Sequence, residues 1–106
     1  MDIISHRGAS AYSQENSLKS FAIAKSMGST MFELDVHLTK DNKIVVHHDY
    51  NLKRLFNKNL EIINTPYKNL KKHIPTLAQV LKLLGKHCFV CVEIKNDDER
   101  YQNIEY

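Results

Sequence analysis

Three carboxylates stand at the ends of two apolar stretches. Glu33 and Asp35 are one residue apart in Met31–Val36, and Glu93 and Lys95 have the same spacing further on. Residues two apart on a strand point to one face, so each pair presents its side chains together. Converging carboxylates repel one another unless a cation lies between them, and Ca²⁺ and Mg²⁺ prefer oxygen ligands. The pattern predicts a divalent metal site at Glu33, Asp35 and Glu93.

Basic side chains follow the same apolar runs. His6 and Arg7 come directly after the first run, His48 follows Ile44–His47, and Lys95 ends the last. Around a divalent ion these residues would form a positively charged pocket, which suits a phosphate ester. The other histidines are expected to be surface or packing residues: His37, His73 and His87.

Each of these motifs also has a purely structural interpretation. An isolated Glu-x-Asp on a strand more often holds salt-bridged or solvated carboxylates than a metal ion. A His followed by Arg is common in turns that bind nothing. The basic stretch from Lys53 to His73 is interleaved with Asn, Leu and Ile, which favours a solvated surface over a polyanion-binding one. Only the order of all the motifs along the chain is specific enough to indicate a function.

The elements that must position these residues alternate between strand and helix. Short apolar runs predict strands, an i, i+3, i+4 stripe predicts each helix, and a small β-hairpin follows the second strand. Acidic residues after the third strand predict the start of another helix, and Asp49–Ile74 is expected to be an irregular connection. The predicted ranges are strands 3–5, 31–36 and 89–95, helices 16–27 and 76–85, hairpin arms 37–39 and 44–47, and a helix beginning at 96–99. Such alternation implies parallel strands, and therefore the α/β class.

Composition limits the classes of protein to be considered. The chain has 106 residues, 42% of them hydrophobic, and a formal net charge of +3, which predicts one globular domain and does not require nucleic acid. Neither an export signal nor a membrane span is visible, so a cytoplasmic protein is expected. Cys88 and Cys91 fall in a predicted buried strand, where residues three apart point to opposite faces. Reduced structural cysteines are therefore favoured over a zinc or redox pair.

Taken in order, the motifs resemble the glycerophosphodiester phosphodiesterase family over essentially the whole chain. The blocks that carry the resemblance are His6-Arg7-Gly8, Glu15-Asn16-Ser17, Glu33-Leu34-Asp35-Val36, Thr39-Lys40-Asp41, Val46-His47-His48-Asp49, Ile74-Pro75-Thr76-Leu77 and Val92-Glu93-Ile94-Lys95. One departure is Gln14, which stands where the family usually has Pro before the Glu-Asn pair, and this change should affect loop rigidity more than chemistry.

The resemblance implies a TIM-like barrel that hydrolyses glycerophosphodiesters to sn-glycerol 3-phosphate and an alcohol. The implied roles are His6 and His48 as general acid and base, Glu33, Asp35 and Glu93 as ligands of Ca²⁺ or Mg²⁺, and Arg7 and Lys95 as phosphate-binding residues. Family chemistry looks like attack by the neighbouring glycerol hydroxyl, giving a cyclic phosphate that water opens. Two histidines with pKa values near neutrality suit the two proton transfers.

The length of the chain leaves the functional state open. A (β/α)₈ barrel needs ~250 residues, so a chain of 106 residues with three predicted main strands is expected to be about the N-terminal half of one. It could be a phosphodiesterase in its own right, or a truncated or split-gene product that is inactive alone. Unpaired strand edges would favour a homo-oligomer or pairing with a complementing C-terminal half. A basic binding module has only the Lys53–His73 stretch in its favour.

Overall fold

The computed structural model describes residues 4–6 and 15–95. Its elements are β1 (Ile4–His6), α1 (Leu18–Ser26), β2 (Met31–Leu38), β3 (Ile44–Val46), α2 (Lys53–Phe56), the 3₁₀ helices η1 (Ile62–Asn64) and η2 (Tyr67–Asn69), α3 (Leu77–Leu84) and β4 (Phe89–Ile94). This order confirms the predicted α/β class. Within the described residues, no helix is both long enough and apolar enough to cross a membrane.

Strand β2 is the centre of the sheet. It pairs in parallel with β1 and with β4, and antiparallel with β3. The carbonyl of Asp35 accepts a hydrogen bond from the His47 N–H at 3.0 Å, whereas the carbonyl of Val36 accepts one from Lys95 at 3.2 Å. Adjacent carbonyls of a strand point to opposite edges, so β3 and β4 flank β2 on opposite sides. The prediction that the three main strands are parallel neighbours is confirmed.

The predicted hairpin is present, but its first arm is not a separate strand. β2 continues through the predicted arm as far as Leu38, and β3 returns beside it with Leu38 opposite Ile44. The turn is closed by a hydrogen bond of 2.9 Å from the Thr39 N–H to the Lys43 carbonyl. Asn42 has φ 64°, a left-handed conformation that Asn tolerates better than most residues.

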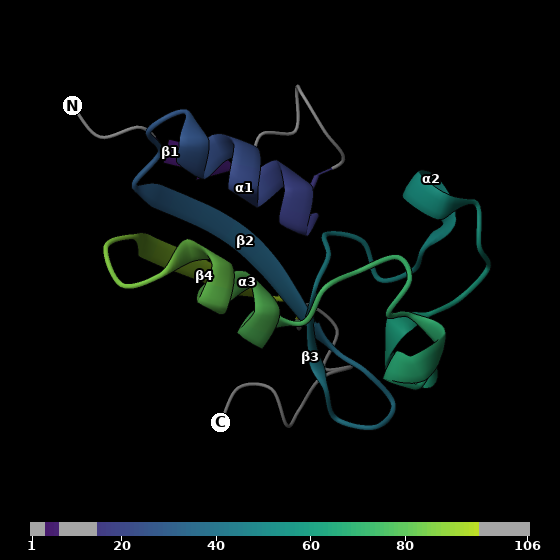
Figure 1. The fold of residues 1–106 in the computed structure, drawn as a ribbon. Helices are drawn as coiled ribbons and strands as arrows, with labels where there is room; N and C mark the ends of the chain where they lie inside the picture. The colour runs from purple at the N-terminus through teal and green to yellow at the C-terminus, as the bar shows by residue number, and fades with distance from the viewer. Residues whose placement is uncertain (1–3, 7–14, 96–106) are drawn as a thin grey trace.

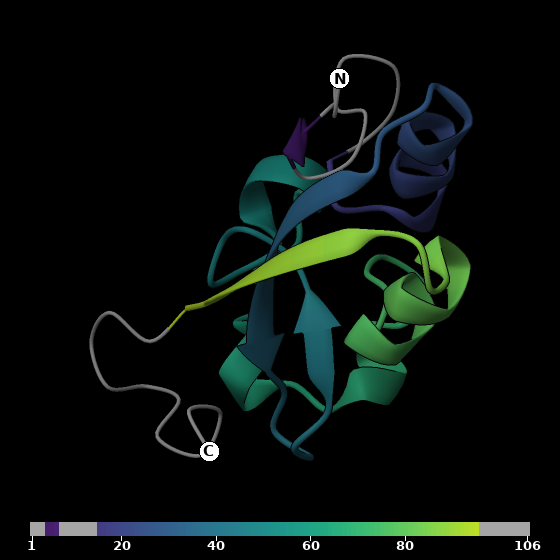
Figure 2. The same ribbon diagram turned by 90° about the vertical axis from the view of Figure 1, so that its left-hand side faces the viewer.

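Helices α1 and α3 cover one face of the sheet, as Figure 2 shows, and this packing is the main core. Alternate residues of β2 point to that face and meet the buried sides of both helices. The buried members of this cluster are Phe21, Ala24, Phe32, Leu34, Val36, Val46, Val80 and Leu84. Each helix begins with a capping box, in which Ser17 pairs with Ser20 and Thr76 with Gln79. The odd-numbered side chains of β2 are therefore directed to the opposite face.

The connection from Asp49 to Ile74, expected to be irregular, has a core of its own. One α-helical turn, α2, and the two 3₁₀ helices fold it against β3, to one side of the main sheet in Figure 1. The buried apolar residues of this second cluster are Val45, Leu52, Ile62, Leu70 and Ile74. Their spacing has no helical or strand period, so the sequence pattern could not reveal them.

Strand β4 is exposed rather than buried, contrary to the prediction. Phe89 is 73% exposed and Ile94 is 41% exposed, because within the described residues β4 pairs only with β2. Cys91 is an exposed free cysteine on β4, whereas Cys88 precedes the strand and its thiol donates to the Leu84 carbonyl at 3.3 Å. The expected helix from residue 96 lies outside the described residues.

Candidate active site

The register of the sheet brings the predicted acidic residues onto one face. Asp35 of β2 is paired with Glu93 of β4, and Glu33 with Cys91. Paired residues on neighbouring strands point the same way, so all three carboxylates lie on the face that the helices do not cover. The backbone of His6 lies beside Glu33 through the β1–β2 register. Because parallel strands end at one edge, these positions gather at the edge where α/β proteins build their sites.

Lys95 lies between two of these carboxylates. Its Nζ is 3.2 Å from Glu93 Oε1 and 3.7 Å from Asp35 Oδ1. The Lys95 and Asp35 side chains are largely shielded, at 13% and 5% exposure, whereas that of Glu93 is 65% exposed. The hydrogen bond from Lys95, helped by its charge, lowers the pKa of Glu93. The ammonium group thus offsets part of the negative charge of these two carboxylates.

Asn16 completes the buried side of this cluster, and sequence reasoning did not assign it to the site. It adopts φ 56° just before the N-cap of α1 and is 2% exposed. Its Nδ2 donates to Asp35 Oδ2 at 3.4 Å, while its Oδ1 is buried without a hydrogen-bond partner among the described residues. A buried acceptor left unsatisfied costs about 1–3 kcal/mol. Its place in the Glu15-Asn16-Ser17 block was the signal in the sequence.

A metal ion fits the donor chemistry of this cluster, although not its present arrangement. Among the described residues, no three His, Cys, Asp or Glu side chains are placed to hold one. The oxygens available are nevertheless those that hard cations prefer, from Glu33, Asp35, Glu93 and the unsatisfied amide of Asn16. An ion among them would have to displace the Lys95 ammonium from its contacts with Asp35 and Glu93.

His48 stands beside the cluster and is oriented by its neighbour in sequence. Its Nδ1 lies 2.8 Å from Asp49 Oδ1, and Arg54 Nε donates to Asp49 Oδ2 at 2.8 Å. Partial burial alone would raise the pKa of Asp49, but the hydrogen bonds from Arg54 and His48 outweigh it and lower the pKa to about 2. An ionised Asp49 accepts the proton on Nδ1, which leaves Nε2 of a neutral His48 free to accept one.

Two other histidines are buried packing residues rather than surface ones. His37 Nε2 donates to the His48 carbonyl at 3.1 Å and its ring meets Tyr50 edge-on at 5.1 Å. Burial lowers the pKa of His37 to about 4. His47 Nε2 donates to the Asn51 carbonyl at 3.1 Å, and burial likewise lowers its pKa. Both imidazoles are therefore neutral near pH 7; His37 links β2 to the 47–51 segment, and His47 closes a turn within that segment.

The side chains of two predicted site residues lie outside the described part of the structure. His6 is placed by its backbone alone, and Arg7 lies outside the described residues. The structure does bring together the predicted Asp35, Glu93 and Lys95. The charge of His48 also contributes, as a minor cause, to the lowered pKa of Glu93.

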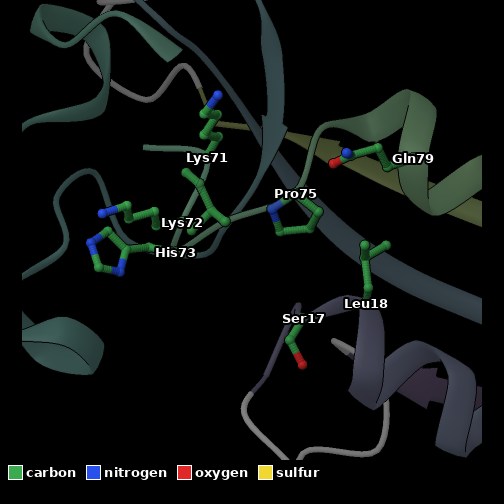
Figure 3. Close-up of a pocket in the computed structure, with 8 residues that line it drawn as sticks. Ser17, Leu18, Lys71, Lys72, His73, Pro75 and Gln79 are labelled. Carbon is green, nitrogen blue, oxygen red and sulfur yellow. The ribbon is translucent and has the colours of Figure 1, made fainter. Parts of the chain in front are cut away.

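Apart from the carboxylate face, a hollow lies between the N-termini of α1 and α3, and basic side chains are part of its lining. Its empty volume is about 450 Å³, and it is lined by Ser17, Leu18, Lys71, Lys72, His73, Ile74, Pro75 and Gln79. Figure 3 shows the Lys71 and Lys72 side chains extending away from Leu18 and Pro75. With no carboxylate in its lining and no converging polar groups, this hollow is a weaker candidate than the Asp35–Glu93 face.

Comparison with known proteins points to a single family. Residues 6–104 match the model of the glycerophosphoryl diester phosphodiesterase family. A glycerophosphodiester phosphodiesterase from Caldanaerobacter subterraneus is 35% identical, over 97% of this chain and 49% of its own length. This chain spans 49% of that protein's length, 45% and 40% of two Bacillus subtilis relatives, and 24% of a human one.

Solved structures give the same result. The crystal structure of a glycerophosphodiester phosphodiesterase from Thermotoga maritima superposes with a TM-score of 0.87 at 36% identity, covering 99% of this chain and 49% of that one. An Oleispira antarctica phosphodiesterase in complex with the product sn-glycerol-3-phosphate has a TM-score of 0.81 at 28% identity, over 90% and 44% of the two chains. A parallel α/β fold that matches half of these barrels is a partial barrel. The chain belongs to the glycerophosphoryl diester phosphodiesterase family.

Proposed function

We propose that this chain carries the N-terminal half of the active site of a metal-dependent phosphodiesterase, which hydrolyses glycerophosphodiesters to sn-glycerol 3-phosphate and an alcohol. The observation that supports it most directly is the convergence of Asn16, Asp35, Glu93 and Lys95 on the face that the helices leave uncovered. The ring of His48 is held by Asp49, and its charge acts on Glu93. Family membership supplies the reaction class.

The acidic residues and Lys95 would manage the charge of the phosphodiester. Glu33, Asp35 and Glu93 would hold Ca²⁺ or Mg²⁺, with the Asn16 amide oxygen nearby. When bound, the ion would stabilise the negative charge that develops on the phosphate oxygens. Lys95, displaced from between the carboxylates, would donate to a phosphate oxygen, and Arg7 would donate to another. The same ammonium would thus neutralise the site before substrate arrives and bind the substrate afterwards.

The histidines would move the protons. In the first step, the glycerol hydroxyl next to the phosphodiester loses its proton to one imidazole and attacks phosphorus, while the other imidazole protonates the departing alcohol. In the second step, the imidazole that protonated the alcohol takes a proton from water, which attacks phosphorus, while the other imidazole returns its proton to the glycerol oxygen as its bond to phosphorus breaks, giving sn-glycerol 3-phosphate. His48 suits either role through its Nε2, because Asp49 engages Nδ1 at 2.8 Å. His6 is the proposed second histidine, from the register position beside Glu33.

The chain alone should be a weak hydrolase or an inactive one. β4 leaves Phe89, Val92 and Ile94 exposed, and within the described residues it has one strand neighbour. Walls that hold the substrate and exclude water would have to come from further strands, and such positioning can account for about 7–11 kcal/mol of a barrier. A complementing C-terminal half is the proposed source of these walls.

The test supplies that half from a relative. The C-terminal half of the Thermotoga maritima protein would be mixed with this chain, and release of sn-glycerol 3-phosphate from glycerophosphocholine would be followed with Mg²⁺, Ca²⁺ or chelator. We expect activity only in the mixture with a divalent ion, and its loss in a His48→Ala chain. A stable complex of the two halves that stays inactive with both ions would contradict the proposal.

A further inference from the structure

Arg54 makes four hydrogen bonds to two carboxylates, although its side chain is 47% exposed. It lies on α2, and its guanidinium holds two carboxylates at once. Nη1 and Nη2 donate to the two oxygens of Glu15 at 2.9 Å each, while Nε and Nη2 donate to the two oxygens of Asp49 at 2.8 and 3.3 Å. The planar fork of a guanidinium matches a carboxylate in this way, and an ammonium group does not.

One of these carboxylates leads directly to His48. Asp49 Oδ1 lies 2.8 Å from His48 Nδ1, so the carboxylate that Arg54 grips is also the acceptor that selects the imidazole tautomer. An acceptor of this kind orients a ring only if its own rotation is restrained. Two hydrogen bonds from one rigid guanidinium provide that restraint.

The other carboxylate leads to the acidic cluster. Glu15 immediately precedes Asn16, whose amide donates to Asp35 at 3.4 Å. The Glu15 side chain is only 12% exposed, although that of Arg54 is 47% exposed. Arg54 therefore joins the segment that enters α1 to the segment that leaves β3, and each of them delivers one residue to the site.

Helix α2 is short, with four residues, none of them buried, and its N-cap makes no side-chain hydrogen bond. Apolar packing attaches it to the 49–74 cluster, through the buried N-cap residue Leu52 and through Phe56, whose ring centroid lies 4.7 Å from that of His73. An exposed ion pair adds only about 0–1 kcal/mol to stability. Because apolar packing already attaches α2, the four hydrogen bonds of Arg54 point to a role in holding the two carboxylates rather than the helix.

We infer that Arg54 is a positioning residue: its guanidinium holds Asp49 where it orients His48, and holds Glu15 where Asn16 stays against Asp35. The part of this inference that concerns catalysis rests on the proposed function, because it takes His48 as an acid or base. The geometric part stands without any turnover.

The imidazole ¹⁵N shifts of His48 test the geometric part. They would be recorded in the wild-type chain, in Arg54→Met, in Arg54→Lys and in a matched control, Lys53→Met, which alters an exposed neighbour on α2 outside the Glu15–Arg54–Asp49 contacts. At a pH where the ring is neutral, we expect wild type and control to show the Nδ1–H tautomer. Arg54→Met should move toward the average of two exchanging tautomers, and added guanidinium ion should shift it back.

The outcomes separate positioning from simple stabilisation. A folded Arg54→Met chain with wild-type His48 shifts would overturn the inference. If Arg54→Met does not fold, Arg54→Lys becomes the test, because lysine keeps the positive charge but not the planar guanidinium. Unchanged His48 shifts in Arg54→Lys would also overturn the inference. In the complemented enzyme, Arg54→Lys should lower kcat by roughly 10–100-fold with little change in KM. Absence of turnover in wild type would count against the proposed function only, since the shifts would still decide the role of Arg54.

Discussion

Replacing Lys95 with methionine tests the arrangement of charge at the centre of the site. Asp35 is nearly enclosed, so removing the ammonium 3.7 Å away would take a positive charge from beside a shielded carboxyl group. At an effective dielectric constant of about 20 the attraction at this distance is roughly 4 kcal/mol, and desolvation of the ammonium offsets part of it. The hydrogen bond from Asn16 to Asp35 remains. We therefore expect Lys95→Met to lower the free energy of unfolding by about 2–3 kcal/mol.

Thermal unfolding followed by circular dichroism is the assay. For a domain of this size the loss corresponds to a fall in Tm of roughly 10–20 °C, measured with chelator present. Lys86→Met, which changes an exposed lysine between α3 and β4, is the matched control and should unfold close to wild type. If the two variants unfold at the same temperature, Lys95 does not stabilise the carboxylates and the reasoning is wrong.

Thermal unfolding of the same two proteins, wild type and Lys95→Met, with added divalent ions tests the metal proposal. An ion and the Lys95 ammonium would compete for Asp35 and Glu93, so the ion stabilises wild type by its own binding free energy less the contacts that Lys95 gives up. Binding at 100 times Kd contributes about 2.7 kcal/mol. Lys95→Met has no such contacts to lose and should gain more from Mg²⁺ or Ca²⁺ than wild type. Identical unfolding of both proteins with either ion and with chelator would contradict the metal proposal.

Three further outcomes are expected. Asp35→Asn should reduce the stabilisation by divalent ions more than it disturbs β2, since it removes one negative donor and keeps the shape; unfolding with and without ion measures both. Because burial lowers the pKa of His37 from 6.5 to about 4, the unfolded chain takes up this proton first as pH falls. The contribution of His37 to the free energy of unfolding is therefore fully present above pH 6.5 and falls by about 3 kcal/mol as the pH drops toward 4. Unfolding curves of His37→Gln should show a smaller loss of stability over this pH range. Leu84→Ala should cost about 2–5 kcal/mol, whereas Leu81→Ala, at a position 42% exposed on the same helix, should cost far less in urea unfolding.

Local patterns in the sequence were sufficient for the main elements and for the face of the carboxylates. The stripe that begins at Leu77, between the cap at Thr76 and the stop at Gly85, predicted α3 within one residue at each end. The alternation in Met31–Val36 placed Glu33 and Asp35 opposite the core because a strand has a period of two. Such signals lie within a few residues of the feature that they predict.

Contacts between distant segments could not be predicted from the same signals. Arg54 stood in a basic stretch expected to be a solvated surface, and nothing near it indicates Glu15, which is 39 positions away, as its partner. Lys95 was expected to bind phosphate, whereas in the structure its ammonium lies between Asp35 and Glu93. The exposure of β4 likewise depends on which strands flank it, and residue composition does not encode that information.

The pairing of β2 with β4 has a consequence for how the site forms. Met31 is opposite Phe89, so the ladder closes across more than half of the chain. Contacts between residues so far apart in sequence carry a large loop-closure entropy and slow folding. The β2–β3 hairpin and the 49–74 cluster are local by comparison and can form early. During synthesis Asp35 leaves the ribosome well before Glu93, so the two carboxylates of the site cannot meet until the chain has been made as far as β4.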